Sequence, residues 1–139
     1  MPPVPVPSDV EEFLRRANPA IVATLRRDGS PHTVPTWYDW EDGRVLLNMD
    51  ESRVRLQHIR RDPRVSLTVL DGHQWYRHVS LLGRIVSIED DDDFEDIDRL
   101  SRRYTGNPFG RRGRRVSAWM QPERWHGWSG GGPWPSSFS

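Results

Sequence analysis

The sequence contains no cysteine and no lysine. Without cysteine, disulfide bonds, thiolate zinc sites, cysteine nucleophiles and dithiol redox pairs are excluded. All twenty basic side chains are arginine, a bias that we interpret first as codon usage. No apolar run approaches the roughly 18 residues that a membrane-spanning helix requires. Residues 1–7 lack the basic and apolar regions of a signal peptide, so we expect a cytoplasmic protein.

Net charge is also lacking, because 20 acidic side chains balance 20 basic ones. This balance, with an acidic run at residues 89–96, counts against nucleic-acid binding, which needs a net basic face. Aromatic residues are plentiful, with seven Trp, three Tyr and four Phe. A chain of 139 residues with a mean hydropathy of −0.78 is therefore the size of one domain, with a small aromatic-rich core and a well-solvated surface.

Short strands joined by tight turns are predicted for the first half of the chain. The β-branched run at 20–25 is followed by Asp28-Gly29, which is typical of a hairpin turn, and residues 41–43 mark a second turn. Ser8 and Glu11 have the spacing of a helix capping box. The expected elements are a helix at 8–17, strands at 20–25, 32–40 and 44–49, and a helix at 52–61.

The second half predicts longer elements. Gly83 indicates a bulge or a close backbone approach within a long strand. The acidic run starting at Glu89 is interpreted as a helix N-terminus, because carboxylates first and arginines last match the helix dipole. The expected elements are strands at 64–70, 75–88 and 116–120, a helix at 89–104, a terminal arm at 121–128 and a Gly-, Ser- and Pro-rich tail in which nothing packs.

About six strands in a meander, with two or three short helices, predict a mainly β fold in the form of a small closed or nearly closed barrel. Such a barrel fills its own interior, so a ligand larger than a few atoms must bind on its flank or between subunits. The expected organisation is an extended lead-in at 1–7, a barrel domain at 8–128 and a flexible tail at 129–139.

The segment after the third strand has the residue types of an anion site. Ser52, Arg53 and Arg55 arrive where a helix N-terminus is expected, and free N–H groups, a positive dipole end and guanidinium forks together favour a phosphate. The alternative is that Arg53, Arg55, Arg60 and Arg61 form the solvated face of an amphipathic helix.

The whole pattern resembles the FMN-binding split β-barrel superfamily of pyridoxamine 5′-phosphate oxidase-like proteins, most closely its branch of coenzyme F420-dependent oxidoreductases. The resemblance runs in order from about residue 9 to residue 128. The resemblance rests on these segments: Ala23 to His32, Val34 to Tyr38, the strand ending at Asn48, Ser52 to Leu67, Gly83 to Ile85, Arg99 to Tyr104 and Pro122 to Trp128.

The resemblance implies a homodimer with cofactors in grooves between two barrels. It implies that Val34, Pro35, Thr36 and Trp37 contact the tricyclic ring and that Asn48 and Met49 lie near the ribityl chain. It further implies that Ser52, Arg53 and Arg55 hold the phosphate, with Arg60 and the 111–115 turn toward an oligoglutamate tail. Trp125 and Trp128 would lie over the neighbouring subunit's groove. For the 111–115 turn, a solvated hairpin is the alternative.

Hydride transfer between F420 and a planar conjugated small molecule is the activity that the resemblance implies. The alternatives are an FMN-dependent oxidase or reductase of the same fold and an F420 carrier without turnover. No Ser-His-Asp order, paired-carboxylate motif or metal-ligand spacing is present in the sequence. The residue that would protonate a product is unknown, and His78 and Tyr76 are the candidates because both lie on the expected long strand.

Overall fold

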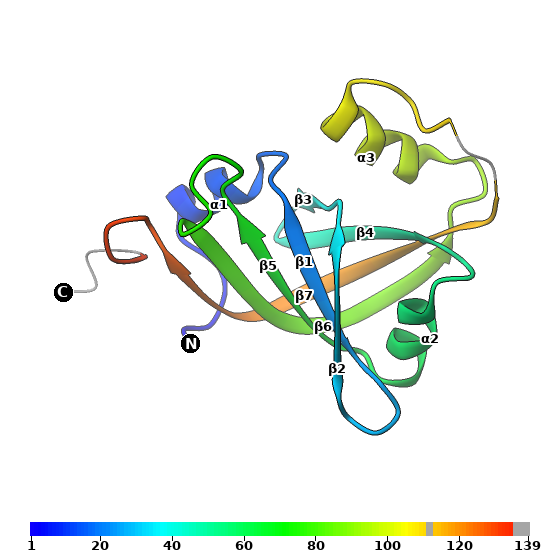
Figure 1. Ribbon diagram of the computed structural model, residues 1–139, viewed down its shortest axis with the longest axis horizontal. Coiled ribbons are helices and arrows are strands. Elements are labelled where there is room, and N and C mark those ends of the chain that lie inside the picture. The colour runs from blue at the N-terminus through cyan, green and yellow to red at the C-terminus, as the bar shows by residue number, and fades with distance from the viewer. Residues whose placement is uncertain (111–112, 135–139) are drawn as a thin grey trace.

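The computed structural model describes residues 1–110 and 113–134, which form one curved β-sheet flanked by three helices (Figure 1). The elements are α1 (Ser8–Leu14), β1 (Ala20–Leu25), β2 (Pro31–Thr36), β3 (Asp39–Glu41), β4 (Arg44–Asp50), α2 (Val54–Arg61), β5 (Arg64–Leu70), β6 (His78–Asp90), α3 (Glu95–Thr105), β7 (Arg115–Trp128) and β8 (Pro133–Trp134). Within these residues, no helix is long and apolar enough to span a membrane.

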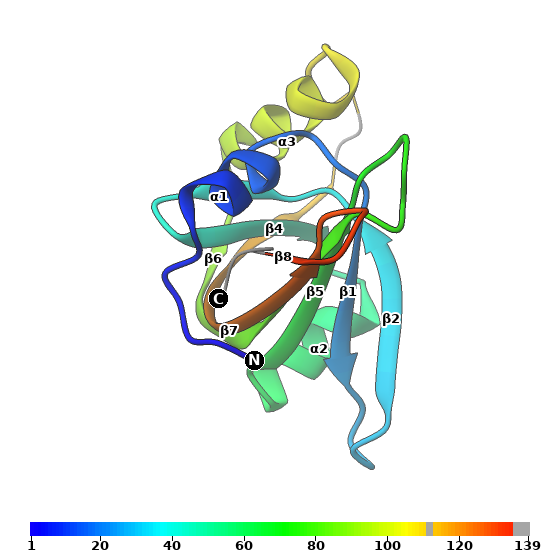
Figure 2. The same cartoon turned by 90° about the vertical axis from the view of Figure 1, so that its left-hand side faces the viewer.

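The sheet curves into a barrel that is left open between its two end strands, β2 and β3, and this opening is called the break. Its order is β2-β1-β5-β6-β7-β4-β3, with β8 added beside β7. β2 and β3 therefore lie at opposite ends of the sheet, yet only Trp37 and Tyr38 separate them in the chain. A two-residue connection can join the two ends only if the sheet curves into a barrel, as Figure 2 shows. The mainly β, split-barrel prediction is confirmed.

The two predicted hairpin turns form as expected. Gly29 closes the β1–β2 turn with a φ of 85°, and Asp42 and Gly43 join β3 to β4 with φ values of 51° and 77°. Two consecutive residues in the left-handed region give a turn whose twist matches that of the flanking strands. The meander prediction is only partly right, since the expected strand at 32–40 is two strands that pair with different neighbours.

β6 and β7 are the longest strands and pair along most of their length. Their register shifts at Gly83, where an added Cβ would lie 2.1 Å from the Gln121 carbonyl oxygen. The predicted close backbone approach is thus confirmed. β7 continues from Arg115 to Trp128, so the expected short strand and terminal arm are one element. β6 begins at His78, and Trp75 and Tyr76 lie in the preceding loop.

The acidic run is divided between two elements, which corrects the expected helix at 89–104. Glu89 and Asp90 end β6, and α3 begins only at Glu95. Asp91 is buried between them, and its carboxylate accepts the backbone N–H groups of Asp96 (3.1 Å) and Ile97 (2.9 Å). A buried carboxylate therefore satisfies the free amides at the helix N-terminus.

At the first helix the capping-box prediction is wrong. Pro7 is the N-cap and Ser8 already lies inside α1, which ends at Leu14 rather than at residue 17. The Glu11 carboxylate instead accepts the indole N–H of Trp40 at 3.0 Å and pairs with Arg15. Glu11 thus ties α1 to the sheet.

Segments near both ends of the described chain, at Pro3 and at Trp134, pack against the barrel. Pro3 bridges to Arg124 of β7, in keeping with an extended lead-in. The prediction that nothing packs after Ser129 is wrong at Trp134, which is 7% exposed. Its indole donates to the Asp9 carboxylate at 2.8 Å. Residues 135–139 of the predicted tail lie outside the described residues.

Trp125 is 1% exposed in the hydrophobic core of its own barrel. The implied role of Trp125 over a neighbouring groove is therefore wrong, because the alternation of β7 places its side chain inward.

Candidate functional site

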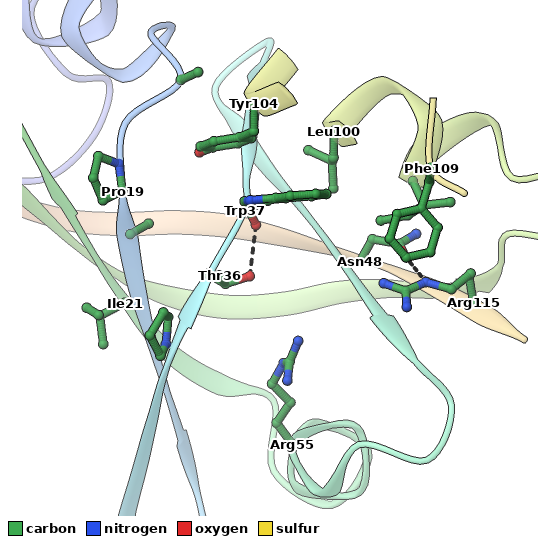
Figure 3. Close-up of a pocket in the computed structure, with 14 residues that line it drawn as sticks. Pro19, Ile21, Thr36, Trp37, Asn48, Arg55, Leu100, Tyr104, Phe109 and Arg115 are labelled. Carbon is green, nitrogen blue, oxygen red and sulfur yellow. Dashed lines mark hydrogen bonds between the residues drawn. The ribbon is translucent and has the colours of Figure 1, made fainter. Parts of the chain in front are cut away.

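A pocket of about 680 Å³ opens where β1, β2 and β4 face α3 and the start of β7 (Figure 3). Its lining is mostly apolar, with a few polar side chains, as is usual for a small-molecule site. The lining residues are Ala17, Pro19, Ala20, Ile21, Pro35, Thr36, Trp37, Asn48, Arg55, Ile97, Leu100, Tyr104, Phe109 and Arg115.

Three aromatic rings form one wall of the pocket. The rings of Trp37 and Tyr104 are nearly parallel, with centroids 5.5 Å apart and an interplanar angle of 7°. Phe109 meets Trp37 edge-on at 6.5 Å. Figure 3 shows Tyr104 on one side of the Trp37 indole and Arg55 on the other. The indole therefore offers a flat face to the pocket, on which a planar ring can stack.

The connection between β2 and β3 fixes Trp37 in place. The neighbouring Tyr38 is fully buried, and its hydroxyl donates to the carbonyl oxygens of Leu14 (2.7 Å) and Arg16 (3.0 Å). The Tyr104 hydroxyl donates to the Asn18 carbonyl at 2.7 Å. Burial raises the pKa of both tyrosines, so their phenols stay protonated at neutral pH. The wall is thus held from the α1 side by neutral hydrogen bonds.

Arg103 of α3 lies outside the pocket and bonds to the end of α1 and to the β2–β3 connection. Its guanidinium donates to the carbonyl oxygens of Tyr38 (2.9 Å) and Arg15 (2.6 Å), and also to those of Leu14 and Arg16. It lies over the Tyr38 and Tyr104 rings at 5.1 and 5.7 Å. One side chain therefore connects α3, the C-terminal end of α1 and the break in the barrel.

A buried polar network orients the amide and guanidinium groups at the opposite wall. Arg115 Nε donates to Asn48 Oδ1 at 3.0 Å, and Asn48 Nδ2 donates to Asp91 Oδ2 (3.1 Å) and Ser117 Oγ (3.0 Å). Ser117 in turn donates to Asp96 Oδ2 at 2.6 Å. The Arg115 guanidinium also lies 4.8 Å over the Phe109 ring. Arg115 is thus held rigidly at the edge of the pocket.

Arg55 projects from the first turn of α2 into the pocket (Figure 3). The side chain is half-buried, and within the described part of the chain it has neither a hydrogen bond nor an ion pair. Burial lowers its pKa, and the charges of Arg53 and Arg115 lower it further. Since an arginine remains charged at neutral pH, this is a desolvated cation among other cations. Such a group favours binding of an anion.

Ser52 and Asp50 form a tight turn before α2. The Ser52 hydroxyl and backbone N–H both donate to Asp50 Oδ1, at 2.6 and 2.8 Å. These bonds chiefly lower the pKa of Asp50, with a smaller contribution from Arg115 and Arg53. The Ser52 hydroxyl is therefore already bonded within the chain, and the nearby Asp50 carboxylate partly offsets the positive charge.

The pocket brings together five of the individually implicated residues, Pro35, Thr36, Trp37, Asn48 and Arg55, and also Arg115 of the implicated 111–115 turn. The other implicated residues do not line it; they are Val34, Met49, Ser52, Arg53, Arg60 and Trp128. Val34 and Met49 pack in or against the core, whereas Ser52, Arg53 and Arg60 are exposed around α2. Trp128 is 40% exposed at the far end of β7, opposite His78 of β6.

The two candidate proton donors lie outside this pocket. Tyr76 is 67% exposed in the loop before β6, where it stacks on Trp75. His78 shares a 2.7 Å hydrogen bond with the Tyr76 carbonyl oxygen. Neither side chain lines the pocket within a single subunit.

Sequence reasoning missed the contributions of α3 and the segment after it. Leu100 and Tyr104 belong to the apolar stripe of the predicted helix, a signal that indicates burial but not a pocket. Phe109 carried no such signal, and Arg115 was implicated only as part of the 111–115 turn, toward an oligoglutamate tail rather than in the pocket. Of the basic turn, Arg114 pairs with Glu51 (3.5 Å) and Asp90 (3.6 Å), and residues 111 and 112 lie outside the described residues.

No group of three or more His, Asp or Glu side chains is placed to hold a metal ion in residues 1–110 and 113–134.

Comparisons with known proteins agree with this architecture. A solved structure of an F420 reductase has a TM-score of 0.79 and 25% identity, covering 86% of this chain and 98% of that one. A conserved hypothetical protein from Mycobacterium tuberculosis has a TM-score of 0.70 and 26% identity, covering 93% and 88%. General Stress Protein 26 from Bacillus anthracis shares the fold, with a TM-score of 0.64, 17% identity, and coverage of 85% and 89%.

No curated protein matches the chain. Residues 6–129 match the sequence model of pyridoxamine 5′-phosphate oxidase. This match spans most of the chain and agrees with the split barrel seen in the structure. The chain therefore belongs to the pyridoxamine 5′-phosphate oxidase family.

Proposed function

We propose that this protein is an F420-dependent reductase that transfers a hydride between the deazaflavin and a planar conjugated small molecule. The observation that carries the proposal is the pairing, in one pocket, of a flat aromatic face at Trp37 with the cation of Arg55, which has no hydrogen bond or ion pair among the described residues. A cofactor with a planar ring and a phosphate is complementary to both groups, since the ring can stack on Trp37 and the phosphate can bind Arg55. The structural similarity to an F420 reductase favours the deazaflavin over FMN.

The residues present fit such a cofactor. The Trp37 indole has one face covered by Tyr104, and its other face can stack on a tricyclic ring. Arg55 offers a guanidinium fork to a phosphate at the N-terminal turn of α2, where the helix dipole also favours an anion. Asn48 and Arg115, fixed by their mutual hydrogen bond, provide polar groups between the two ends.

The bound cofactor supplies the hydride chemistry, while the protein binds, orients and shields it. Pro19, Ile21 and Leu100 contribute apolar surface that excludes water from the ring. Trp37 sets the plane of the ring, and Arg55 holds the phosphate end. The side chain that moves a proton is not assigned; Tyr76 and His78 remain candidates only if a second subunit brings them to the pocket.

A homodimer is part of the proposal. One subunit leaves the pocket open on the barrel flank, where a second barrel can complete it. The partly exposed aromatic side chain of Trp128 is suited to that interface. Ser52, Arg53 and Arg60, exposed around α2, are proposed to extend the anion site toward the rest of the cofactor.

The first experiment is titration of purified, cofactor-free protein with F420 and separately with FMN, followed by quenching of tryptophan fluorescence. We expect tighter binding of F420, and oxidation of reduced F420 when conjugated acceptors are added. Tighter binding of FMN would move the protein to the flavin branch. Binding of F420 without turnover across a panel of acceptors would support a carrier instead.

Arg55→Ala tests the anion site directly. Loss of a charge-assisted contact predicts F420 binding weaker by roughly ten- to a hundredfold. Because Arg55 has no partner among the described residues, the variant should unfold at the same temperature as the parent or higher. Arg27→Ala, in the exposed β1–β2 turn, is the matched control and should bind normally. Unchanged affinity in Arg55→Ala would refute the assignment of the phosphate site.

A further inference from the structure

Polar side chains continue from the pocket into the barrel interior. Thr36 and Arg55 line the outer pocket and also a small void of about 10 Å³ inside the barrel. Thr24 of β1 lines the same void. A void of this size matches one water molecule, and these three side chains are polar groups on its wall. Thr24 therefore shares the wall of an otherwise apolar void with two residues of the pocket, Thr36 and Arg55.

Beyond Thr24 lies a pair of histidines. The Thr24 hydroxyl and His58 Nδ1 share a hydrogen bond of 2.8 Å, and both residues are buried. The His32 ring meets the His58 ring edge-on, with centroids 5.2 Å apart. His32 Nδ1 is buried and has no hydrogen-bond partner among the described residues. β2 and α2 thus bring two imidazoles together, with one ring nitrogen left unsatisfied.

The surroundings of His58 oppose its protonation in the protein without an anion. Burial lowers the pKa of His58, and the charges of His32, Arg61 and Arg26 lower it further. These groups come from α2, β2 and the β1–β2 turn, and all of them oppose protonation. His58 therefore carries no charge at neutral pH.

His58 follows Arg55 by three residues on α2, which places the two side chains on one side of the helix about one turn apart. An anion bound at Arg55 brings negative charge close to His58. Nearby opposite charge favours the protonated imidazole, so it counteracts the cost of burying that charge.

We propose that His58, held by Thr24 and flanked by His32, is a proton-linked positioning residue for the anion site at Arg55, and that anion binding there is accompanied by proton uptake at the histidine pair. The inference shares with the proposed function only the assignment of Arg55 as an anion ligand. Because linkage is reciprocal, anion affinity rises as the pH falls through the pKa that His58 has in the anion-bound protein.

Sulfate is the probe, because it stays fully ionised across this pH range and any proton taken up belongs to the protein. The imidazole pKa of each histidine is measured by NMR titration of the full chain, with and without saturating sulfate. We expect sulfate to raise the pKa of His58 and to leave that of the exposed loop residue His73 nearly unchanged. Equal shifts at His58 and His73, or no shift at His58, would overturn the inference.

Affinity is the second readout. Coulomb attraction across one helix turn at the effective dielectric of a protein predicts sulfate binding roughly three- to tenfold tighter near pH 5.5 than near pH 7.5. His58→Gln keeps a hydrogen-bonding group for Thr24 and should lose most of this ratio, whereas His73→Gln should keep it. If His58→Gln does not fold, the NMR titration of the parent protein still decides the question.

The outcomes separate this inference from the proposed function. A sulfate-dependent rise in the pKa of His58 in a protein that does not bind F420 would refute the cofactor assignment and leave the histidine linkage standing. Tight F420 binding with an unchanged pKa of His58 would do the reverse.

Discussion

Two arginines of this chain show that the surroundings of a residue, rather than its type, decide its role. Arg103 is 15% exposed in its side chain, and backbone carbonyl oxygens and the Asp39 carboxylate satisfy its guanidinium. Arg55 is half-buried without any such partner among the described residues. The first is suited to holding the fold together, and the second to holding a ligand. The sequence singles out Arg55 by its place at the start of a helix, but it gives no sign that Arg103 holds three elements together.

Trp134 is a residue whose importance the local sequence conceals. Its surroundings of Gly, Ser and Pro indicate a flexible tail, yet the indole packs edge-on against Phe13 at 5.3 Å and under the Arg77 guanidinium at 4.8 Å. A tryptophan near the end of a chain can fill a gap in a core that composition does not reveal.

Trp134→Ala is accordingly expected to lower the free energy of unfolding by about 3 kcal/mol, through lost burial and the loss of the bond to Asp9. Urea denaturation followed by circular dichroism measures this loss. Trp75→Ala is the control, because Trp75 is 67% exposed and its removal should change stability by less than about 0.5 kcal/mol. Equal effects in the two variants would show that β8 does not pack as described.

At the scale of elements, the sequence was informative where local chemistry decides the structure. The Asp28-Gly29 and Asp42-Gly43 turns, the β-branched strands and the bulge at Gly83 follow from residue types alone. Element boundaries were less predictable, because tertiary contacts set them. The acidic run reads as the start of a helix, but pairing of β6 with β7 draws Glu89 and Asp90 into a strand, and Asp91 then caps the helix.

Gly83→Ala tests the close approach of β6 and β7. The new Cβ would meet the Gln121 carbonyl oxygen at 2.1 Å and the Pro122 Cα at 2.8 Å, both backbone atoms that cannot swing aside. We expect a loss of at least about 2 kcal/mol in the free energy of unfolding, measured by thermal or urea denaturation.

The matched control for that substitution is Gly110→Ala. A Cβ at Gly110 meets nothing within 4 Å, and its φ is not positive, so its stability should be nearly unchanged. A Gly83→Ala protein as stable as the control would mean that the two strands can separate at the bulge without cost.

At the scale of the whole molecule, the pocket depends on closure of the barrel. Its lining comes from segments as distant in sequence as Ala17, Arg55 and Arg115, which a local pattern cannot bring together. The resemblance to known proteins supplied Pro35 to Trp37, Asn48 and Arg55. The α3 residues were missed because their apolar stripe indicates only burial, and the position of α3 over the break follows from the closed sheet.

Arg103 connects that closure to ligand binding without lining the pocket. Arg103→Ala removes charge-assisted hydrogen bonds to four carbonyl oxygens and frees α3 and the Trp37–Tyr38 connection to move. We expect a stability loss of about 3 kcal/mol and weaker F420 binding in conditions where the variant remains folded. Hydrogen exchange should show faster opening at β2, β3 and α3 than at β5 and β6.

Arg102→Ala is the control, since Arg102 is an exposed neighbour on the same helix. It should match the parent protein in stability, exchange and affinity. If Arg103→Ala lost stability evenly across all strands, Arg103 would serve the barrel as a whole. If the loss were confined to α3, β2 and β3 and ligand binding were also weaker, Arg103 would instead be shown to hold the aromatic wall of the pocket in position opposite Arg55, although it does not line the pocket itself.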